Sequence, residues 1–155
     1  MAHSGKEKTQ RLQPVYEMAC DKERLAAQAV GEVFRDLEFQ RLRLSELLRY
    51  RDEYVQRMQE QVRSGMDMVQ LNDYRAFLSK LSRAITQQEH AVRLSEDALT
   101  EKKQAWYYHR GKVKALLKVM EQHRRLMQIN DNRREQGESD EFALLGRSLL
   151  RRVSD

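Results

Sequence analysis

Residues 71–127 contain an unbroken series of positions spaced alternately three and four residues apart, most of them apolar. This alternation is the heptad spacing of a coiled coil, in which a narrow seam of one long helix faces another helix. Such a seam encloses no cavity, so the pattern predicts a rod whose surface binds other proteins. The predicted seam consists of Leu71, Tyr74, Leu78, Leu81, Ile85, Gln88, Val92, Ser95, Leu99, Lys102, Trp106, His109, Val113, Leu116, Met120, His123 and Met127.

A second heptad series precedes the first along residues 12–58. Polar residues interrupt it at Glu23, Gln40 and Arg51, but the spacing continues on both sides of each interruption. The chain therefore contains two long amphipathic helices of the same kind. The apolar positions of this earlier seam are Leu12, Tyr16, Ala19, Ala26, Val30, Val33, Leu37, Leu44, Leu47, Tyr54 and Met58.

A short connection separates the two series. Gly65 is suited to the left-handed conformation that ends a helix, and Asp67 followed by Gln70 resembles a capping box that begins the next one. Helices joined by so short a turn must run antiparallel as neighbours. The predicted fold is all-α, a long two-helix antiparallel coiled-coil hairpin in residues 1–135, with a first helix over about 12–64, a turn near 65–67 and a second helix over about 68–134.

The last part of the chain has weaker helical signals. Residues 130–132 read Asn-Asp-Asn, and residues 136–139 contain Gly137, so we expect the second helix to end or fray here. Leucine pairs at 144–145 and 149–150 are compatible with a short amphipathic segment. Residues 136–155 are therefore predicted to form a mobile or partly helical basic tail.

Charge gives a weak indication of partners. The 155 residues include 29 Lys and Arg against 24 Asp and Glu, for a net charge of +5, but the two signs alternate along both helices. Alternation favours a solvated coiled-coil flank over a nucleic-acid surface. The basic runs at 124–125, 133–134 and 147–152 leave two readings, a solvated helix face or a contact with an acidic partner or anionic lipid.

Residues with catalytic or metal-binding potential are sparse. Cys20 is the only cysteine, His109 and His123 fall on the seam, and no phosphate-binding loop or nucleophile motif is present. We expect no enzyme activity, no cofactor and no metal site. The polar start of the chain and the lack of a long apolar stretch predict a cytoplasmic protein.

Some apolar residues exceed what a two-helix seam requires. Leu48, Tyr50 and Phe77 lie beside the predicted seam and widen it where the two helices meet the turn. Surplus apolar surface indicates a third element, either a partner protein or a folded-over tail. Tyr107 and Tyr108 also point off the seam, where they either anchor a partner or are covered by neighbouring charged side chains.

These residues carry a resemblance to a known family. Tyr50 and Tyr54, the glycine turn, and Tyr74 with Phe77 occur in the order and at the separations found in the FliJ family, the small coiled-coil components of the bacterial flagellar type III export apparatus. The resemblance spans nearly the whole chain. Its matching segments are residues 47–54, residues 72–78, Leu81, Ala84, Ile85, Gln87, Gln88, residues 104–106 and residues 140–143.

The resemblance implies a non-enzymatic stalk similar to the coiled coil of the rotary ATPase gamma subunit. It implies binding to the hexameric export ATPase FliI, promotion of ring formation and activity, a link to the export gate protein FlhA, and contact with chaperones of late export substrates. It places the protein peripherally at the cytoplasmic face of the inner membrane, at the flagellar base. The gate-binding positions that it implies are Leu47, Tyr50, Tyr54, Phe77, Leu81, Ala84 and Gln88, the last standing where the family commonly has histidine.

The similarity to the rotary stalk also implies an ATPase contact near the two chain ends, where Lys118, Arg124 and Arg125 are suited to acidic surfaces inside a ring. Two other functions remain compatible with the sequence. A generic structural coiled-coil adaptor would need only the seams, and a basic helical binder of nucleic acid or membrane surfaces would use the arginine runs. Salt-dependent retention on DNA would favour the nucleic-acid reading.

Overall fold

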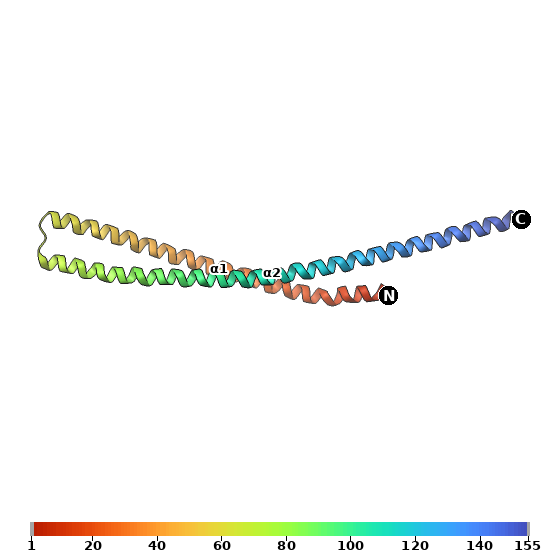
Figure 1. Cartoon of the computed structure of the whole chain (residues 1–155), viewed down its shortest axis with the longest axis horizontal. Coiled ribbons are helices and arrows are strands. Elements are labelled where there is room, and N and C mark those ends of the chain that lie inside the picture. Colours follow the sequence, from red (N-terminus) through yellow and green to blue (C-terminus); the bar gives the residue numbers. More distant parts are fainter. Residues whose placement is uncertain (1, 155) are drawn as a thin grey trace. The chain divides into compact units, whose positions relative to one another are not determined.

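A computed structural model describes residues 2–154, with side chains from residue 6 onward. It contains helix α1 (Ala2–Arg63) and helix α2 (Met68–Val153), and no strand occurs among the described residues (Figure 1). The two helices pack against each other, which confirms the predicted all-α helical hairpin. Both helices pass through two compact units: the turn unit, residues 24–108, and the terminal unit, residues 1–23 with 109–155.

The chain reverses between the helices through Ser64 to Asp67. Gly65 has a φ of 94° and is the one residue with positive φ in the described part of the chain, as expected for a left-handed helix end. The carboxylate of Asp67 accepts a hydrogen bond from the backbone N–H of Gln70 at 2.9 Å and so caps the start of α2. The predicted glycine turn and aspartate cap are both confirmed.

Both helices extend further than the sequence predicts. Helix α1 begins at Ala2 instead of near residue 12, although Pro14 lies inside it. Proline removes one helical hydrogen bond, a cost of about 3 kcal/mol, which a 62-residue helix packed on a partner tolerates. Helix α2 continues to Val153 instead of ending near residue 134. The predicted helix end near Gly137 is therefore wrong, while mobility of residues 136–155 stays a prediction.

The continuation of α2 has a simple physical reason. Asparagine costs less than about 0.7 kcal/mol in a helix and glycine about 1 kcal/mol. Neither residue type removes a backbone donor, and α2 contains no proline. Weak helix formers therefore lower the stability of this segment without ending it.

The core of the turn unit follows the predicted seams. Leu37 of α1 is only 2% exposed, and five successive seam positions of α2 are buried with it. Every other seam position of this unit is half-buried except Lys102, which is exposed. This seam position adds nothing to the buried core, because a long ammonium side chain at the edge of a thin core extends into water. The buried positions of α2 are Leu81, Ile85, Gln88, Val92 and Ser95.

Polar residues join the helices in the middle of this seam. The Gln88 side-chain amide donates hydrogen bonds to the Oε1 of Gln40 at 2.7 Å and to its backbone carbonyl at 3.0 Å. The Ser95 hydroxyl donates to a carboxylate oxygen of Asp36 at 2.9 Å. No buried side-chain nitrogen or oxygen in the described residues lacks a partner. Satisfied polar layers of this kind fix the register of two helices at some cost in stability.

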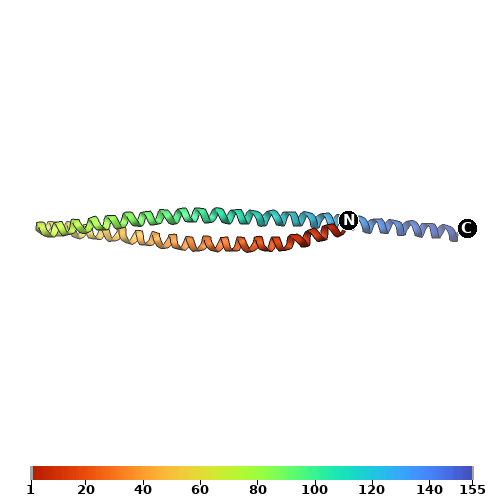
Figure 2. The same cartoon turned by 90° about the horizontal axis from the view of Figure 1, so that it is seen from below.

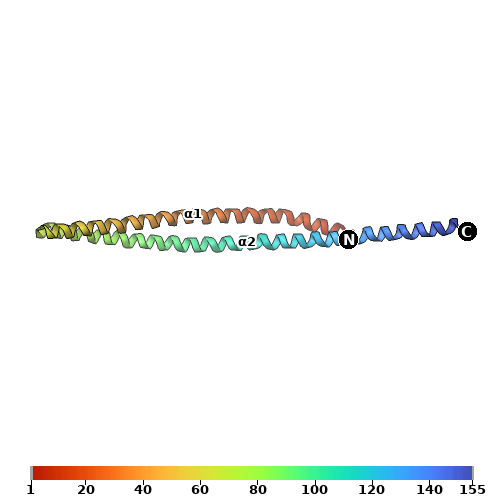
Figure 3. The same cartoon turned by 90° about the horizontal axis from the view of Figure 1, so that it is seen from above.

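The terminal unit has a smaller core. Ala19 of α1 and Met120 of α2 are buried, and the other seam positions up to Met127 are half-buried. From Gln128 to Ser154 every side chain is exposed, with Gly146 as the single half-buried residue. Figures 2 and 3 show this last part of α2, in blue, with no segment of α1 beside it.

Candidate protein-binding surfaces

An aromatic cluster joins the two helices in the turn unit close to the chain reversal. Helix α1 contributes Tyr50 and Tyr54, and α2 contributes Tyr74 and Phe77. The Tyr54 ring lies at the centre, with its centroid 4.4 Å from that of Phe77 and 4.9 Å from that of Tyr74. Each such pair contributes roughly 0.5–1.5 kcal/mol beyond the area that it buries. The cluster therefore fixes the helices relative to each other at this level.

The cluster has an inner and an outer part. Tyr50 is 45% exposed, and its ring forms a T-shaped pair with that of Phe77, with the centroids 6.1 Å apart and the ring planes at 78°. Tyr54, Tyr74 and Phe77 are half-buried. Loss of surrounding water raises the pKa of the Tyr54 hydroxyl, and Tyr74, Tyr50 and Asp73 raise it further. The exposed part of the Tyr50 ring, which packs against Phe77, is thus an aromatic surface open to a partner.

The positions implied for gate binding divide into two groups. Leu81 is 6% exposed and Gln88 is 9% exposed, so both face α1 inside the hairpin. The other positions keep accessible surface: Tyr50 is exposed, and Leu47, Tyr54, Phe77 and Ala84 are half-buried. A partner that binds the folded hairpin therefore contacts the second group. Leu81 and Gln88 influence that contact only by setting how the two helices lie against each other.

Tyr50 is bordered by charged residues that were not predicted from the sequence to belong to this surface. A shallow hollow on α1 beside Leu47 and Tyr50 is lined by two arginines and two glutamates. Their spacing was the available signal for three of them, because Arg43, Glu46 and Glu53 lie seven, four and three positions from Tyr50 and so share its face of the helix, whereas Arg49 is its neighbour in sequence. The four charged residues are Arg43, Glu46, Arg49 and Glu53.

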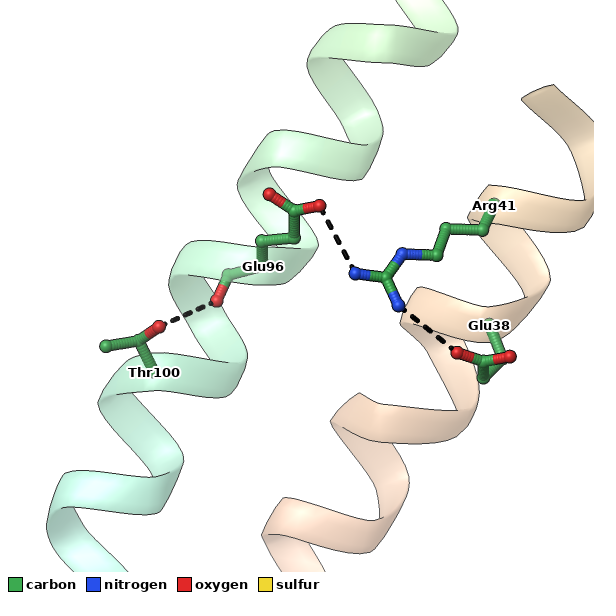
Figure 4. A network of polar contacts seen from close by, with 4 residues as sticks. All are labelled: Glu38, Arg41, Glu96 and Thr100. Atoms are coloured by element: carbon green, nitrogen blue, oxygen red, sulfur yellow. Dashed lines mark hydrogen bonds and ion pairs between the residues drawn. The ribbon is translucent and has the colours of Figure 1, made fainter. Parts of the chain in front are cut away.

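The opposite side of α1 carries an interhelical ion pair. Arg41 lies nine positions from Tyr50, about 180° around a helix with 3.6 residues per turn. Its guanidinium bridges Glu38 on α1 and Glu96 on α2, each at 3.4 Å, and Thr100 donates to the Glu96 carbonyl at 3.1 Å (Figure 4). Half-exposed pairs of this kind contribute at most about 1 kcal/mol. At this level, charged side chains and not aromatic rings join α1 to α2.

The residues implied for ATPase contact lie in the terminal unit. Lys118, Arg124 and Arg125 are all exposed on α2. Arg124 also lines a shallow hollow with Met127 and three residues of α1, Lys6, Thr9 and Gln10. Lys6 adds a cation that the sequence did not predict here. Heptad spacing gives the buried face of each helix but not which residues of α1 and α2 are neighbours at this end.

The remaining candidates form no centre for chemistry. His109 and His123 are half-buried at the seam, Tyr107 and Tyr108 are exposed, and the rings of Trp106 and Tyr107 lie 5.2 Å apart. Among residues 2–154 no group of three or more His, Cys, Asp or Glu side chains is arranged to hold a metal ion. None of the helical segments in that range combines the length and apolar character of a membrane span.

These observations define an α-helical hairpin of the coiled-coil class with an exposed aromatic surface near its turn. A family model described as Flagellar FliJ protein matches residues 8–148, so the chain belongs to the FliJ family. This membership makes it a component of the flagellar export apparatus, in a family of non-enzymatic members. The comparisons with curated proteins and with solved structures found no match.

Proposed function

We propose that this protein is a non-enzymatic stalk of the flagellar export apparatus, which uses its turn unit to bind the gate protein FlhA and its terminal unit to bind the export ATPase FliI. The ATPase contact promotes ring formation and hydrolysis. Through these two partners the protein is held at the cytoplasmic face of the inner membrane. Chaperones of late export substrates are further partners of the same stalk.

The observation that carries the gate assignment is the exposed Tyr50 ring resting on Phe77 across the two helices. The seam does not require it, since Tyr54 already contacts Tyr74 and Phe77 of α2 at this level. Large aromatic side chains that are held rigidly at the surface are typical anchors of protein interfaces. The proposed gate-binding surface therefore consists of Leu47, Tyr50, Phe77 and the accessible edge of Tyr54, with Ala84 at its border.

Leu81 and Gln88 have a different role in this proposal. Both are buried against α1, and Gln88 is bonded to Gln40. Substituting either changes how the helices meet and so displaces the aromatic rings indirectly. We therefore assign them as positioning residues for the gate-binding surface.

The ATPase assignment depends on charge. Lys6, Lys118, Arg124 and Arg125 belong to one unit, and Lys6 and Arg124 line the same hollow. Exposed cations of this kind steer association with acidic surfaces and are screened by salt. An acidic inner surface of an ATPase ring fits these properties.

The gate assignment is tested by measuring the affinity of the full chain for purified FlhA. Tyr50→Ala should weaken binding at least tenfold, as expected when an interface anchor is truncated. Phe34→Ala is the matched control, because Phe34 is 50% exposed on α1 and lies 16 positions away, about 160° around the helix. Equal loss in both variants, or loss in neither, would overturn the proposed surface.

A further inference from the structure

About the last three turns of α2 expose large apolar side chains. Phe142 is 80% exposed and Val153 is 85% exposed, and the leucines between them are at least 60% exposed. No segment of α1 covers this region, because the burial of α2 residues ends at Met127. The exposed leucines are Leu144, Leu145, Leu149 and Leu150.

Five of the six large apolar side chains of this segment share one side of the helix, whereas Leu144 lies on the opposite side with the arginines. At about 100° per residue, Phe142, Leu145, Leu149 and Val153 fall within a sector of about 80°, and Leu150 widens it to about 140°. The arginines lie outside this sector, with Arg147 and Arg152 flanking its two sides. An apolar face bordered by arginines is the arrangement of helices that lie in a membrane interface.

This segment carries cations beside its apolar face and no acidic residue. Residues 142–154 contain Arg147, Arg151 and Arg152 but no Asp or Glu. A second copy of the segment is a poor occupant, because pairing two apolar faces side by side would bring six arginines together. An anionic bilayer accommodates the apolar face and the cations at once.

We propose that residues 142–153 bind the surface of an anionic lipid bilayer, with the helix in the plane of the interface. Twelve residues rise about 18 Å, far less than a bilayer core of about 30 Å, so the segment lies on the membrane and does not cross it. This contact is additional to the two protein partners and does not depend on either of them.

The test is cosedimentation of the full chain with vesicles of phosphatidylcholine, with or without 30% phosphatidylglycerol. The chain should sediment with the anionic vesicles at least tenfold more strongly than with the neutral ones. Leu145→Glu with Leu149→Glu should abolish this binding. Arg151→Gln with Arg152→Gln should weaken it roughly thirtyfold, since each basic residue near an anionic surface contributes about fivefold.

The matched control is Arg133→Gln with Arg134→Gln, which removes the same charge from two exposed arginines on the same helix. It should keep near wild-type binding. Equal weakening by both arginine pairs would overturn the proposal in favour of general electrostatic attraction. Failure to sediment with any vesicle would also overturn the proposal and leave an acidic protein as the occupant. So would light scattering that shows a dimer without lipid, if the leucine substitutions dissociate that dimer.

Discussion

The Gln88 side-chain amide donates a hydrogen bond to the Oε1 of Gln40 at 2.7 Å, across the middle of the seam between the two helices. Gln88 is 9% exposed, so truncating it removes both hydrogen bonds that Gln40 accepts inside the seam. Gln88→Ala should destabilise the hairpin by about 1–3 kcal/mol. Urea unfolding followed by circular dichroism measures this, with exposed Gln87→Ala as the neighbour that should change stability by less than about 0.5 kcal/mol. Equal effects at both positions would contradict the assigned register.

Leu37 tests the apolar part of the same seam. It is the most buried large side chain in the described residues, at 2% exposure, so Leu37→Ala should cost about 2–5 kcal/mol in the free energy of unfolding. Leu99 is only half-buried, and Leu99→Ala should cost less. Leu42→Ala, at an exposed position of α1, is the control and should be nearly neutral. A thermal unfolding series that ranks these three differently would show that the seam is misplaced.

The heptad spacing predicted which face of each helix is buried, since the alternation from Leu71 to Met127 coincides with the buried side except at Lys102. It did not predict that Gln88 pairs with Gln40, because periodicity gives a face and not a partner. The helix ends were misjudged at Pro14 and Gly137, where local propensity is weak but long helices continue. Tyr50 was recognised as surplus to the seam. Leu81 and Gln88 were both placed on the predicted seam, and their burial inside the hairpin confirms that placement.

We expect the stability of the hairpin at alkaline pH to depend on Tyr54. Its pKa is raised in the folded chain above the ordinary tyrosine value of about 10. The folded state therefore favours the protonated hydroxyl, and this contribution is fully present below pH of about 10 and is lost as pH rises through the folded pKa. Tyr54→Phe removes the ionising group and should reduce the loss of thermal stability between pH 8 and pH 11. Tyr107→Phe, at an exposed position outside the cluster, should leave that loss as it is. An unchanged alkaline loss in Tyr54→Phe would contradict the raised pKa.

The cations of the terminal unit predict a salt-dependent effect on the ATPase. Reversing Arg124 and Arg125 to Glu should lower the stimulation of FliI hydrolysis at low salt. The difference from wild type should shrink as the Debye length falls from about 30 Å at 0.01 M to about 8 Å at 0.15 M. Arg133→Glu with Arg134→Glu carries the same charge change further along α2 and is the control. Equal stimulation by wild type and the Arg124/Arg125 variant at low salt would remove this surface from the ATPase contact.

Two separate surfaces of one hairpin are proposed to serve two partners, and a crossed measurement separates them. Tyr50→Ala with Phe77→Ala, and Arg124→Glu with Arg125→Glu, are each assayed for FlhA affinity and for stimulation of FliI hydrolysis. We expect the aromatic variant to lose gate affinity at least tenfold and to keep ATPase stimulation. We expect the charge-reversed variant to lose ATPase stimulation and to keep gate affinity. Two results would contradict the assignment of the two surfaces. In the first, either variant loses both activities while circular dichroism shows intact helicity. In the second, the aromatic variant loses ATPase stimulation and the charge-reversed variant loses gate affinity.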